Sequence, residues 1–384
     1  MGKIYTALGL MSGTSMDGVD ASIIKSDGRG IFHKIYDEYT EFDTNLYKRL
    51  INLRSQVLSK ADLINFTEEL KILEKEITFF HSKIIDRISA KHKKNTGDDI
   101  DLIGFHGQTI FHDPKSKISK QLGDGRLLSQ ITKKKVIYDF RQNDLKNGGQ
   151  GAPLTPIFHN LLANLIYKKY KNEFSNILNI GGISNITNTV KDSDFLKKNI
   201  EAFDIGPGNC LIDEWIRRNS DKKFDDRGLI AKSGKVNRLI LNQAIENFKF
   251  TSYNKSLDIK EFDISFAKGL SLEDGCATIT NFTAYLIVEG INFSKKKENA
   301  VSEYLICGGG RKNDFLIDTM NFYLGNSKNT ILKLIDVYNY DGDYIESQAF
   351  GYLAIRSYLD LPISYPKTTG CTLPSTGGVL VKNY

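Results

Sequence analysis

Residues 4–24 read IYTALGLMSGTSMDGVDASII, and they set the interpretation of the rest of the chain. Two apolar runs, 4–10 and 19–24, flank a turn of small and acidic residues, a pattern that predicts two strands joined as a β-hairpin. Small residues let backbone N–H groups approach an anion, and hydroxyl side chains add donors. The turn is therefore a candidate phosphate-binding loop, although a Gly-rich turn with a purely structural role also fits the pattern.

The candidate phosphate loop contains two carboxylates beside its small residues. Its members are Gly13, Thr14, Ser15, Met16, Asp17, Gly18, Val19 and Asp20. Carboxylates suit a hydrated Mg²⁺ ion, which takes one or two such ligands together with phosphate oxygens. Asp17 is accordingly the candidate ligand for Mg²⁺.

Further along the chain, short apolar runs end repeatedly in polar, Gly-rich or Asp-rich segments. Five such pairs occur, at 102–105 with 106–109, 136–140 with 141–144, 177–180 with 181–185, 202–203 with 204–209, and 304–306 with 307–310. Loops at the ends of strands are where α/β proteins place their chemistry. We therefore interpret the runs as strands and expect their polar ends to line one large cleft.

Two of these polar segments have the composition of nucleotide-binding loops. Segment 204–209 reads DIGPGN and precedes an apolar run, 211–215, that predicts a helix. A Gly-rich loop at a helix N-terminus binds anions, and Gly206 is the candidate ligand-binding residue there. The other segment has three consecutive glycines, on which a flat ring such as adenine can lie: Gly308, Gly309 and Gly310. The sequence contains neither a Walker A loop nor a Rossmann fingerprint.

A helical pattern extends from residue 46 to residue 88. Apolar side chains recur there at three- and four-residue steps, which places them on one face of a helix: Leu70, Leu73, Ile77, Phe80 and Ile84. We expect this stripe to belong to the core and give it no further role.

Length and composition favour a globular protein with two lobes. The chain has 384 residues, 40% of them hydrophobic and 26% charged, which is too long for one small core. Its net charge of +6 is mild, and the densest basic run is only 133–135, so no concentrated patch indicates nucleic-acid binding. The positive charge also suits attraction of an anionic nucleotide or substrate.

The sequence also bears on the compartment. The four cysteines are far apart and lack metal-ligand spacing, which is typical of reduced thiols in a cytosolic enzyme. The N-terminus lacks the long apolar core of a signal peptide, and no stretch approaches the ~18 apolar residues of a membrane span. We expect a cytoplasmic protein that binds neither membranes nor nucleic acid, and the sequence leaves a homodimer open.

The order of the three candidate loops is more specific than any one of them. A hairpin turn, an Asp-Gly loop and a Gly-Gly-Gly loop follow one another along the chain. This order resembles the two phosphate motifs and the adenosine motif of the superfamily of sugar kinases, heat-shock cognate proteins and actin. The resemblance implies an α/β fold with two ribonuclease-H-like lobes, as in actin-like ATPases, around an interlobe nucleotide cleft. We expect 1–149 with the returning segment 345–384 in one lobe, and 150–344 in the other.

Longer segments resemble one family within that superfamily, the anhydro-N-acetylmuramic acid kinases. The similar segments are 9–20, 104–109, 140–154, 179–185, 203–209 and 307–313, and the expected helix 346–354 fits as well. They extend over nearly the full length and occur in the same order as in the family. The resemblance implies that ATP, with Mg²⁺, phosphorylates O6 of 1,6-anhydro-N-acetylmuramic acid while water opens the anhydro ring, a step of peptidoglycan recycling.

The same resemblance implies roles for individual side chains. Asp204 corresponds to the general base that takes a proton from the attacking water, and its alternative role is that of a helix N-cap. Arg141 offers a bidentate fork for the lactyl carboxylate of the sugar, or else forms a surface ion pair. His106 and Thr109 are expected in the sugar pocket, although His106 fits a buried structural histidine equally well. Glu346 is expected to orient water or sugar, or to favour the helix N-terminus through its charge.

One segment departs from the family pattern. Where the family often shows Lys-Ser-Thr-Gly-Arg-Glu, this chain reads KSLDIK at 255–260, so the Arg and Glu have no counterpart. Two other functions stay open on the sequence alone. One is a related kinase with a different sugar or small acid as acceptor, and the other is a regulatory ATP-binding protein without sugar chemistry.

Overall fold

The computed structural model describes residues 2–171, 175–191, 200–248, 253, 256–295, 302–325 and 329–384. Within them the chain forms two compact units. The first unit contains the described residues up to Leu161 and those from Tyr344 to Tyr384, and the second contains the described residues from Leu162 to Asp343. The chain thus returns to the first unit after it has built the second.

The first unit is built on a mixed sheet with the strand order β12-β6-β4-β1-β2-β3, and β5 pairs with β4. Strands β1, β2 and β3 form an antiparallel meander, while β4 is parallel to β1 and β6 is parallel to β4. The predicted N-terminal hairpin is therefore confirmed. The bounds are β1 Tyr5–Ser12, β2 Gly18–Ser26, β3 Phe32–Glu41, β4 Leu102–Asp113, β5 Ile118–Leu122, β6 Val136–Tyr138 and β12 Val379–Val381.

The second unit is built on a mixed sheet with the order β11-β10-β7-β8-β9. Strands β7, β8 and β9 form an antiparallel meander, β10 is parallel to β7, and β11 is parallel to β10. The bounds are β7 Ser175–Ile180, β8 Ile183–Asn188, β9 Glu201–Pro207, β10 Ser302–Cys307 and β11 Thr330–Leu334.

The two sheets share one topology. In each, the first strand of a meander lies between its hairpin partner and a parallel strand from later in the chain, as the paths β3-β2-β1-β4-β6 and β9-β8-β7-β10-β11 show. A parallel neighbour requires a crossover connection, which explains why helices are inserted between meander and parallel strands. This repeated arrangement is the ribonuclease-H-like one, so the predicted α/β fold with two lobes is confirmed.

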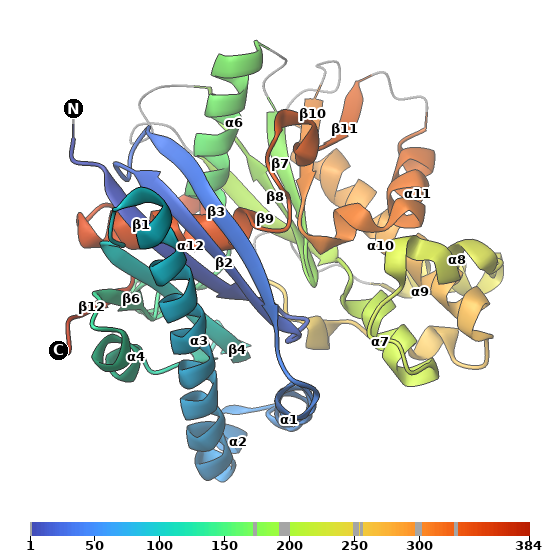
Figure 1. Ribbon diagram of the computed structural model, residues 1–384. Helices are drawn as coiled ribbons and strands as arrows, with labels where there is room; N and C mark the ends of the chain where they lie inside the picture. Colours follow the sequence, from blue (N-terminus) through green and yellow to red (C-terminus); the bar gives the residue numbers. More distant parts are fainter. Residues whose placement is uncertain are drawn as a thin grey trace. The chain divides into compact units, whose positions relative to one another are not determined.

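The crossover from β3 to β4 contains helices α1 (Thr44–Gln56), α2 (Lys60–Asn65) and α3 (Thr67–Thr96), the last of which is the long teal helix in Figure 1. The predicted helical region 46–88 is thus divided, because Ser59 and Asp62 form a capping box that starts α2. The predicted apolar stripe of α3 packs into the first core, which confirms that expectation. The other helices of the first unit are α4 Gly125–Thr132, α5 Gln142–Lys146 and α13 Pro366–Thr369, and α6 Pro156–Tyr170 begins in this unit and continues into the second.

Helix α12 (Ile345–Tyr358) lies against β1, β2 and β4, and its red-orange ribbon crosses the blue strands in Figure 1. The backbone of α12 approaches the backbones of β1 and β4 so closely that no side chain fits at the two contact positions. A Cβ atom at Gly9 would lie 1.9 Å from Ser347 O, and one at Gly104 would lie 2.3 Å from Phe350 O. Glycine on β1 and β4 is therefore required by the approach of the helix.

The second unit surrounds helix α10 (Leu272–Ser294), whose residues are mostly buried. This helix contacts β8 and β9 and also the shorter helices of the unit. Its extensive burial explains why charged residues are few along it, with Glu289 at an exposed position. The shorter helices are α7 Cys210–Asn219, α8 Leu229–Ser233, α9 Arg238–Asn247 and α11 Asp314–Leu324.

Three segments that we expected to be loops lie wholly or partly in strands, and one of them, 183–185, belongs to β8. Residues 106–109 lie inside β4, which continues to Asp113, and Asp204 to Gly206 lie inside β9. Their backbones are paired, with Gln108 opposite Ser12 and Asp204 opposite Asn185. Because sheet pairing uses main-chain groups, polar side chains do not end a strand when a neighbour is present.

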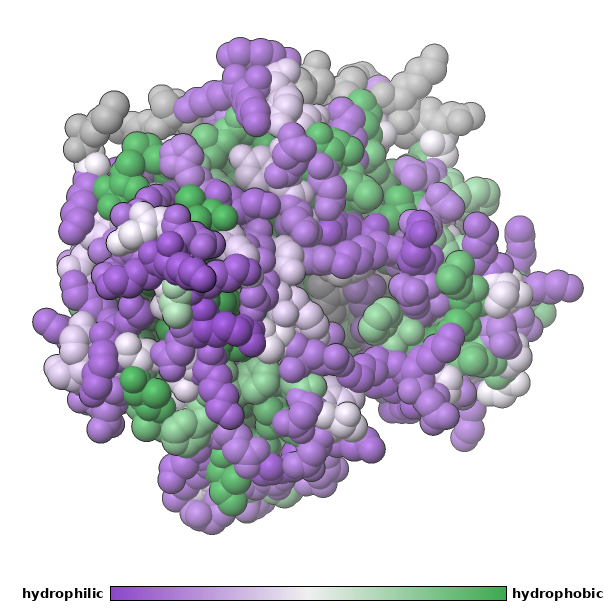
Figure 2. All heavy atoms as spheres, in the orientation of Figure 1, coloured by the Kyte–Doolittle hydropathy of each residue, from purple (hydrophilic) through white to green (hydrophobic). Residues whose placement is uncertain are grey.

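The surface carries few large apolar areas on the face drawn in Figure 2, which is mainly hydrophilic with separate hydrophobic spots. The apolar side chains collect instead in the buried cores of the two units. In the part of the chain that the structure describes, no helix has both the length and the apolar composition needed to cross a bilayer.

Candidate functional site

The turn between β1 and β2 contains the first group of predicted ligand-binding residues. Met16 has a left-handed φ of 57°, its side chain is buried, and its N–H donates to Gly13 O at 3.2 Å. Thr14 and Ser15 are exposed. A Cβ atom at Gly13 would meet nothing closer than Ser15 Oγ at 3.8 Å, so this backbone faces open space. The turn therefore has the accessible backbone and hydroxyls that a phosphate loop needs.

Strand β4 holds this turn in place through the side chain of Gln108. The Ser12 hydroxyl lies 2.5 Å from Gln108 Oε1 and 2.8 Å from Gly18 O, and Gln108 Nε2 donates to Gly13 O at 3.0 Å. Gly18 is packed, since a Cβ atom there would lie 2.5 Å from Thr40 O. Val19 is buried as well. Within the predicted loop, Gly18 and Val19 thus belong to the supporting structure, while residues 13–15 are accessible.

Asp17 lies at the end of the turn with two hydroxyl neighbours. Its carboxylate accepts a hydrogen bond from Ser15 Oγ at 2.5 Å and another from the Tyr39 hydroxyl. Burial and the carboxylates of Asp17, Glu41 and Asp20 raise the pKa of Tyr39, so its phenol stays protonated and donates. No group of three or more His, Cys, Asp or Glu within the described ranges could hold a metal ion. Asp17 fits Mg²⁺ all the same, because Mg²⁺ often takes a single protein carboxylate beside phosphate and water.

Two of the predicted sugar-binding residues are in direct contact in the first unit. The guanidinium of Arg141 lies 2.9 Å (Nη2) and 3.2 Å (Nε) from Nε2 of His106, and its Nη1 donates to Gly151 O at 2.7 Å. His106 and Arg141 are 35 residues apart in the sequence, and they meet because β4 and β6 are parallel neighbours. These contacts tie Arg141 to a histidine and to a carbonyl group of the same unit, and its predicted role at the sugar stays a prediction.

The contacts of His106 define its protonation state. Its Nε2 faces the donors of Arg141 and must accept, so the proton is on Nδ1, which lies 2.8 Å from Gly107 O and donates to it. Burial and the positive charge of Arg141 hold the pKa of His106 well below its usual range. His106 is therefore a neutral imidazole that orients a cation. Thr109, on the same strand, accepts from Gln121 Nε2 at 3.3 Å.

Asp144 is a residue of this region that sequence reasoning missed. Its side chain is 1% exposed and accepts from Gly151 N and from Thr369 Oγ1, both at 2.7 Å. Gly151 therefore contacts Asp144 through its backbone N–H and Arg141 through its backbone carbonyl group. Its position in the polar segment 141–144 could have indicated that Asp144 belongs to the site. Nothing in the sequence, however, distinguishes Asp144 from its neighbours in that segment.

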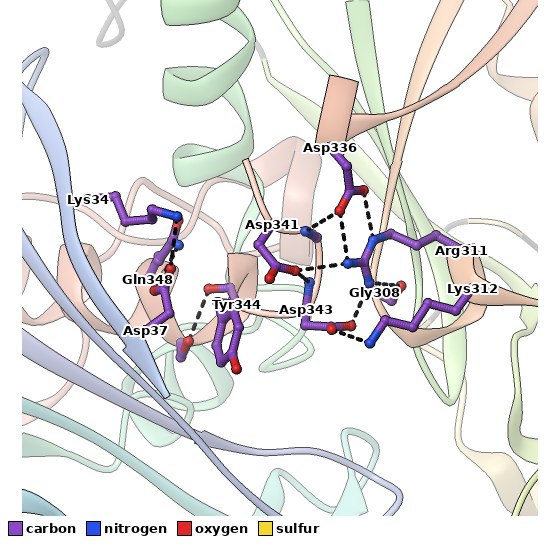
Figure 3. A network of polar contacts seen from close by, with 12 residues as sticks. Lys34, Asp37, Gly308, Arg311, Lys312, Asp336, Asp341, Asp343, Tyr344 and Gln348 are labelled. Atoms are coloured by element: carbon purple, nitrogen blue, oxygen red, sulfur yellow. Dashed lines mark hydrogen bonds and ion pairs between the residues drawn. The ribbon is translucent and has the colours of Figure 1, made fainter. Parts of the chain in front are cut away.

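Glu346 occupies the first turn of α12, where its charge is favoured by the helix N-terminus. The residues after it tie this turn to the sheet. Ser347 Oγ lies 2.6 Å from Ser22 Oγ, and Gln348 Nε2 donates to Asp37 Oδ1 at 3.1 Å (Figure 3). The position of Glu346 at a helix start is as predicted, and its proposed part in orienting water or sugar stays a prediction.

In the second unit, Asp204 lies on β9 with its side chain 6% exposed. Its Oδ2 accepts from the backbone N–H of Leu257 at 2.8 Å and lies 3.3 Å from Ser256 Oγ. The alternative role as a helix N-cap is wrong, because α7 begins at Cys210 and Asn209 holds the capping position. The carboxylate is thus held by the segment that departs from the family pattern. Lys255 of that segment lies outside the described residues.

The two predicted nucleotide loops of the second unit differ in their accessibility. Gly206 has a φ of 152°, and a Cβ atom there would lie 3.3 Å from Leu286 Cβ. At Gly308 and Gly310 an added Cβ would lie 2.5 Å from Asn179 Oδ1 and 2.2 Å from Ile180 Cγ2. Gly309 is exposed, and a Cβ there would meet only Asn209 Nδ2 at 3.6 Å. Gly309 is therefore the glycine of this loop whose backbone is open to a flat ligand.

The structure brings several predicted residues together within each unit. In the first unit, Ser12 and Gln108 link the phosphate loop to the strand of His106, and His106 contacts Arg141. In the second unit, the β7–β8 turn supports the end of β9, since Gly181 O accepts from Asn209 N at 2.8 Å. Each unit thus contains polar, partly accessible groups at the strand ends and turns that the sequence indicated.

Comparison with known proteins adds the family. The family model described as anhydro-N-acetylmuramic acid kinase matches residues 5–383. Similar proteins with this name include one from Pelagibacter ubique, 52% identical over 390 residues with 100% of both chains covered, and one from Agrobacterium fabrum, 35% identical over 387 residues, also with full coverage. Among solved structures, the activator of 2-hydroxyisocaproyl-CoA dehydratase from Clostridium difficile is 13% identical, with a TM-score of 0.41 over 91% of this chain and 94% of the other. The assignment to a family rests on the sequence matches alone.

Two units, each built on a ribonuclease-H-like sheet, with a candidate phosphate loop in the first and a buried carboxylate on a strand of the second, define the two-lobed α/β class of protein. The full-length matches narrow this class. The chain belongs to the anhydro-N-acetylmuramic acid kinase family, as its motifs indicated.

Proposed function

We propose that this chain uses ATP to phosphorylate O6 of 1,6-anhydro-N-acetylmuramic acid while water opens the anhydro ring. The product is N-acetylmuramic acid 6-phosphate, an intermediate of peptidoglycan recycling. The observation that carries the proposal is the match over the full length to a relative named for this kinase, at 52% identity. The geometry within each unit supports separate parts of the reaction.

Asp204 is the general base of the proposed reaction. Water adds through its oxygen to the anomeric carbon, and its proton passes to the Asp204 carboxylate. The bond from the anomeric carbon to O6 breaks, O6 bonds to the γ-phosphorus of ATP, and ADP leaves. The hydrogen bond from Leu257 N to Oδ2 holds the carboxylate in one orientation, which favours proton transfer. General base catalysis typically contributes ~10²–10⁴-fold.

Arg141 binds the lactyl carboxylate in this proposal, and His106 orients Arg141. Because His106 is neutral and accepts from the guanidinium, the positive charge of Arg141 is not compensated by that neighbour. A planar guanidinium held at its Nε edge suits recognition of a carboxylate by paired hydrogen bonds. Thr109 and Glu346 are the further proposed contacts to the sugar.

The nucleotide is held by the turn of the first unit and the glycine loops of the second in this proposal. The exposed backbone and hydroxyls of 13–15 suit phosphate oxygens, and Gly206 and the open Gly309 suit the rest of the nucleotide. Asp17 would hold Mg²⁺, which when bound supplies positive charge to the phosphoryl oxygens. Asp20 lies on the adjoining strand and adds to the acidic character of this end of the hairpin.

The proposal is tested with purified protein, Mg-ATP and 1,6-anhydro-N-acetylmuramic acid. We expect ADP release that depends on the sugar, with one sugar 6-phosphate formed per ADP. Asp204→Asn should lower kcat by about 10²–10⁴-fold, because the amide cannot accept the proton. In ¹⁸O-labelled water the phosphate should stay unlabelled, since phosphorus receives O6 of the sugar.

Asp318→Asn is the matched control, because Asp318 is an exposed carboxylate on α11 of the same unit. Its kcat should equal that of the wild type. If ADP appears without any sugar phosphate, and ¹⁸O enters the phosphate, the chain hydrolyses ATP and the proposed acceptor is wrong. Full activity of Asp204→Asn would remove Asp204 from the mechanism and leave the reaction in place.

A further inference from the structure

Arg311, which directly follows the three glycines, is the most heavily bonded cation among the described residues of the second unit. Its side chain is 5% exposed. Nε and Nη2 form a fork with Asp336 at 2.9 and 3.0 Å, Nη2 also contacts Asp341 at 2.9 Å, and Nη1 contacts Asp343 at 2.5 Å. Figure 3 shows these carboxylates converging on the guanidinium from the segment 336–343.

The neighbouring carboxylates and burial have opposite effects on the pKa of Arg311. Burial disfavours a charged guanidinium, but the neighbouring carboxylates of Asp336 and Asp343 raise the pKa of Arg311 overall. In return, the contact with Arg311 keeps the pKa of Asp336 below its ordinary value, although burial opposes this. Removing one partner of such a buried group is costly, because the remaining charges are left uncompensated. The cluster is therefore a rigid local structure.

The cluster is joined directly to the glycine loop. Arg311 Nη1 donates to Gly308 O at 3.3 Å, and Gly308 N donates to Gly342 O at 2.9 Å. Both polar groups of the Gly308 residue are thus tied to the cluster. Gly342 packs against the guanidinium so closely that a Cβ atom there would lie 2.4 Å from Arg311 Nε. The orientation of the loop consequently depends on the place of the guanidinium.

The fixed loop presents one open position. Gly308 and Gly310 are packed against β7, whereas the backbone of Gly309 is exposed and faces open space. A flat ring can lie on such a backbone only if the two flanking peptides keep their orientation. We propose that Arg311 is a positioning residue for nucleotide binding, which holds the Gly308–Gly310 loop so that Gly309 offers a surface to the adenine ring. This inference rests on the proposed function, because that function places an adenine nucleotide at this loop.

Arg311→Lys is the decisive variant. Lysine keeps the charge but cannot form the fork with Asp336 and the contact with Gly308 O together. We expect the Kd for ADP and the KM for ATP to rise about 10- to 100-fold, while kcat at saturating ATP and the KM for the sugar stay within about twofold. ADP binding is measured by calorimetry without sugar, and the KM values are measured by ADP release.

Two further variants separate positioning from general damage. Asp341→Asn removes one carboxylate but leaves the Asp336 fork, so it should raise the Kd for ADP by a smaller factor. It carries the test if Arg311→Lys fails to fold. Arg227→Lys is the matched control, because Arg227 forms an exposed ion pair with Asp314 at 2.7 Å in the same unit. Its Kd for ADP should equal that of the wild type.

The inference is overturned if Arg311→Lys and Asp341→Asn bind ADP as the wild type does, or if the KM for ATP, the KM for the sugar and kcat all worsen together. Its failure is distinct from failure of the proposed function. A wild-type protein that binds ADP but does not turn over the sugar contradicts the proposed function and still allows the test of Arg311. A wild-type protein that does not bind ADP contradicts both.

Discussion

Asp144 acts on the proposed sugar site through the backbone of a single residue, Gly151. The N–H of Gly151 donates to its carboxylate and the carbonyl of Gly151 accepts from Arg141, so the carboxylate fixes the acceptor that holds the guanidinium. The other oxygen of Asp144 accepts from Thr369, a residue of the returning C-terminal segment. The orientation of Arg141 therefore depends on a side chain that acts through Gly151 and on Thr369, which lies 225 residues after Asp144 in the chain.

Asp144→Asn should weaken sugar binding selectively. An asparagine amide group would turn N–H groups toward the donors of Gly151 or Thr369, and a lost buried hydrogen bond costs about 1–3 kcal/mol. If the whole of that cost falls on sugar binding, the KM for the sugar rises about 5- to 150-fold, while the KM for ATP is unchanged. Steady-state kinetics with each substrate varied in turn gives both values.

Thr369→Val serves as the companion variant, because it removes the other donor and leaves the contact with Gly151. It should change the KM for the sugar much less than Asp144→Asn does. Equal effects of the two variants, or a change in the KM for ATP, would show that Asp144 only stabilises the unit.

For single residues, the sequence indicated which chemical groups matter but not how they are arranged. His106, Arg141 and Asp204 were recognised from motifs, and their roles stay predictions. The contact between His106 and Arg141 depends on the pairing of β4 with β6, which no local pattern encodes. Asp144 and Arg311 were missed as positioning residues because an ordinary Asp or Arg in a loop gives no sign of what will surround it after folding.

Among the elements, α12 shows how a helix is held against a sheet without side chains in between. Gly9→Ala should destabilise the first unit strongly, because the added Cβ would lie 1.9 Å from Ser347 O and 2.3 Å from Gly351 N. Both of these are backbone atoms, so the helix itself must move. Overpacking typically costs about 1–3 kcal/mol, and we expect a loss near or above the upper end. Urea unfolding followed by circular dichroism measures it.

Gly97→Ala provides the comparison for this substitution. Gly97 has a φ of 77° at the end of α3, and a Cβ atom there would meet nothing within 4 Å. The cost there is backbone strain alone, about 1 kcal/mol. A loss from Gly9→Ala no larger than this would mean that α12 is loosely packed on β1.

Some elements were predicted and others were not, for physical reasons. The apolar runs of β1, β2, β7 and β10 are buried on both faces and gave a clear signal. Strand β3 reads FHKIYDEYTE and was missed because Phe32 is its one buried residue, so pairing with β2 rather than burial makes it a strand. Strand β8 reads ISNITN and was taken for part of a polar loop, although its partners on both sides complete its backbone hydrogen bonds.

For the whole molecule, the distribution of histidines is uneven. All six lie before residue 162, and therefore in the first unit. Burial lowers the pKa of His81 to about 4, that of His112 to about 4 and that of His159 to about 3. An unfolded histidine takes up a proton near pH 6.5, whereas these folded ones do not until the pH is much lower. The stability that they contribute is complete above about pH 6.5 and is lost as the pH falls toward 4.

The first unit should consequently unfold at a higher pH than the second. At pH 5 each of these histidines opposes folding by about 2 kcal/mol relative to pH 7, from 1.36 kcal/mol per pH unit. The only tryptophan, Trp215, is buried in the second unit and reports on that unit alone. In an acid titration, the midpoint from circular dichroism should lie at a higher pH than the midpoint from Trp215 fluorescence.

His81→Gln tests the cause. Glutamine does not titrate, and it can still donate to Ile77 O as the ring nitrogen does in the wild type. The circular dichroism midpoint should move to lower pH, while the fluorescence midpoint stays. His33→Gln, at an exposed position, should move neither. Coincident midpoints in the wild type would mean that the two units unfold together.

The hydrogen bond from Leu257 to Asp204 comes from the main chain and not from a side chain. Selection on the proposed base therefore acts on the path of this segment and largely spares the identity of its residues. Mutations can accumulate at 257–260 without loss of the contact, provided that no proline removes the N–H group at 257. A sequence motif that required particular residues at 257–260 would therefore exclude true members of the family. The number of substitutions in this segment is likewise a poor measure of lost activity.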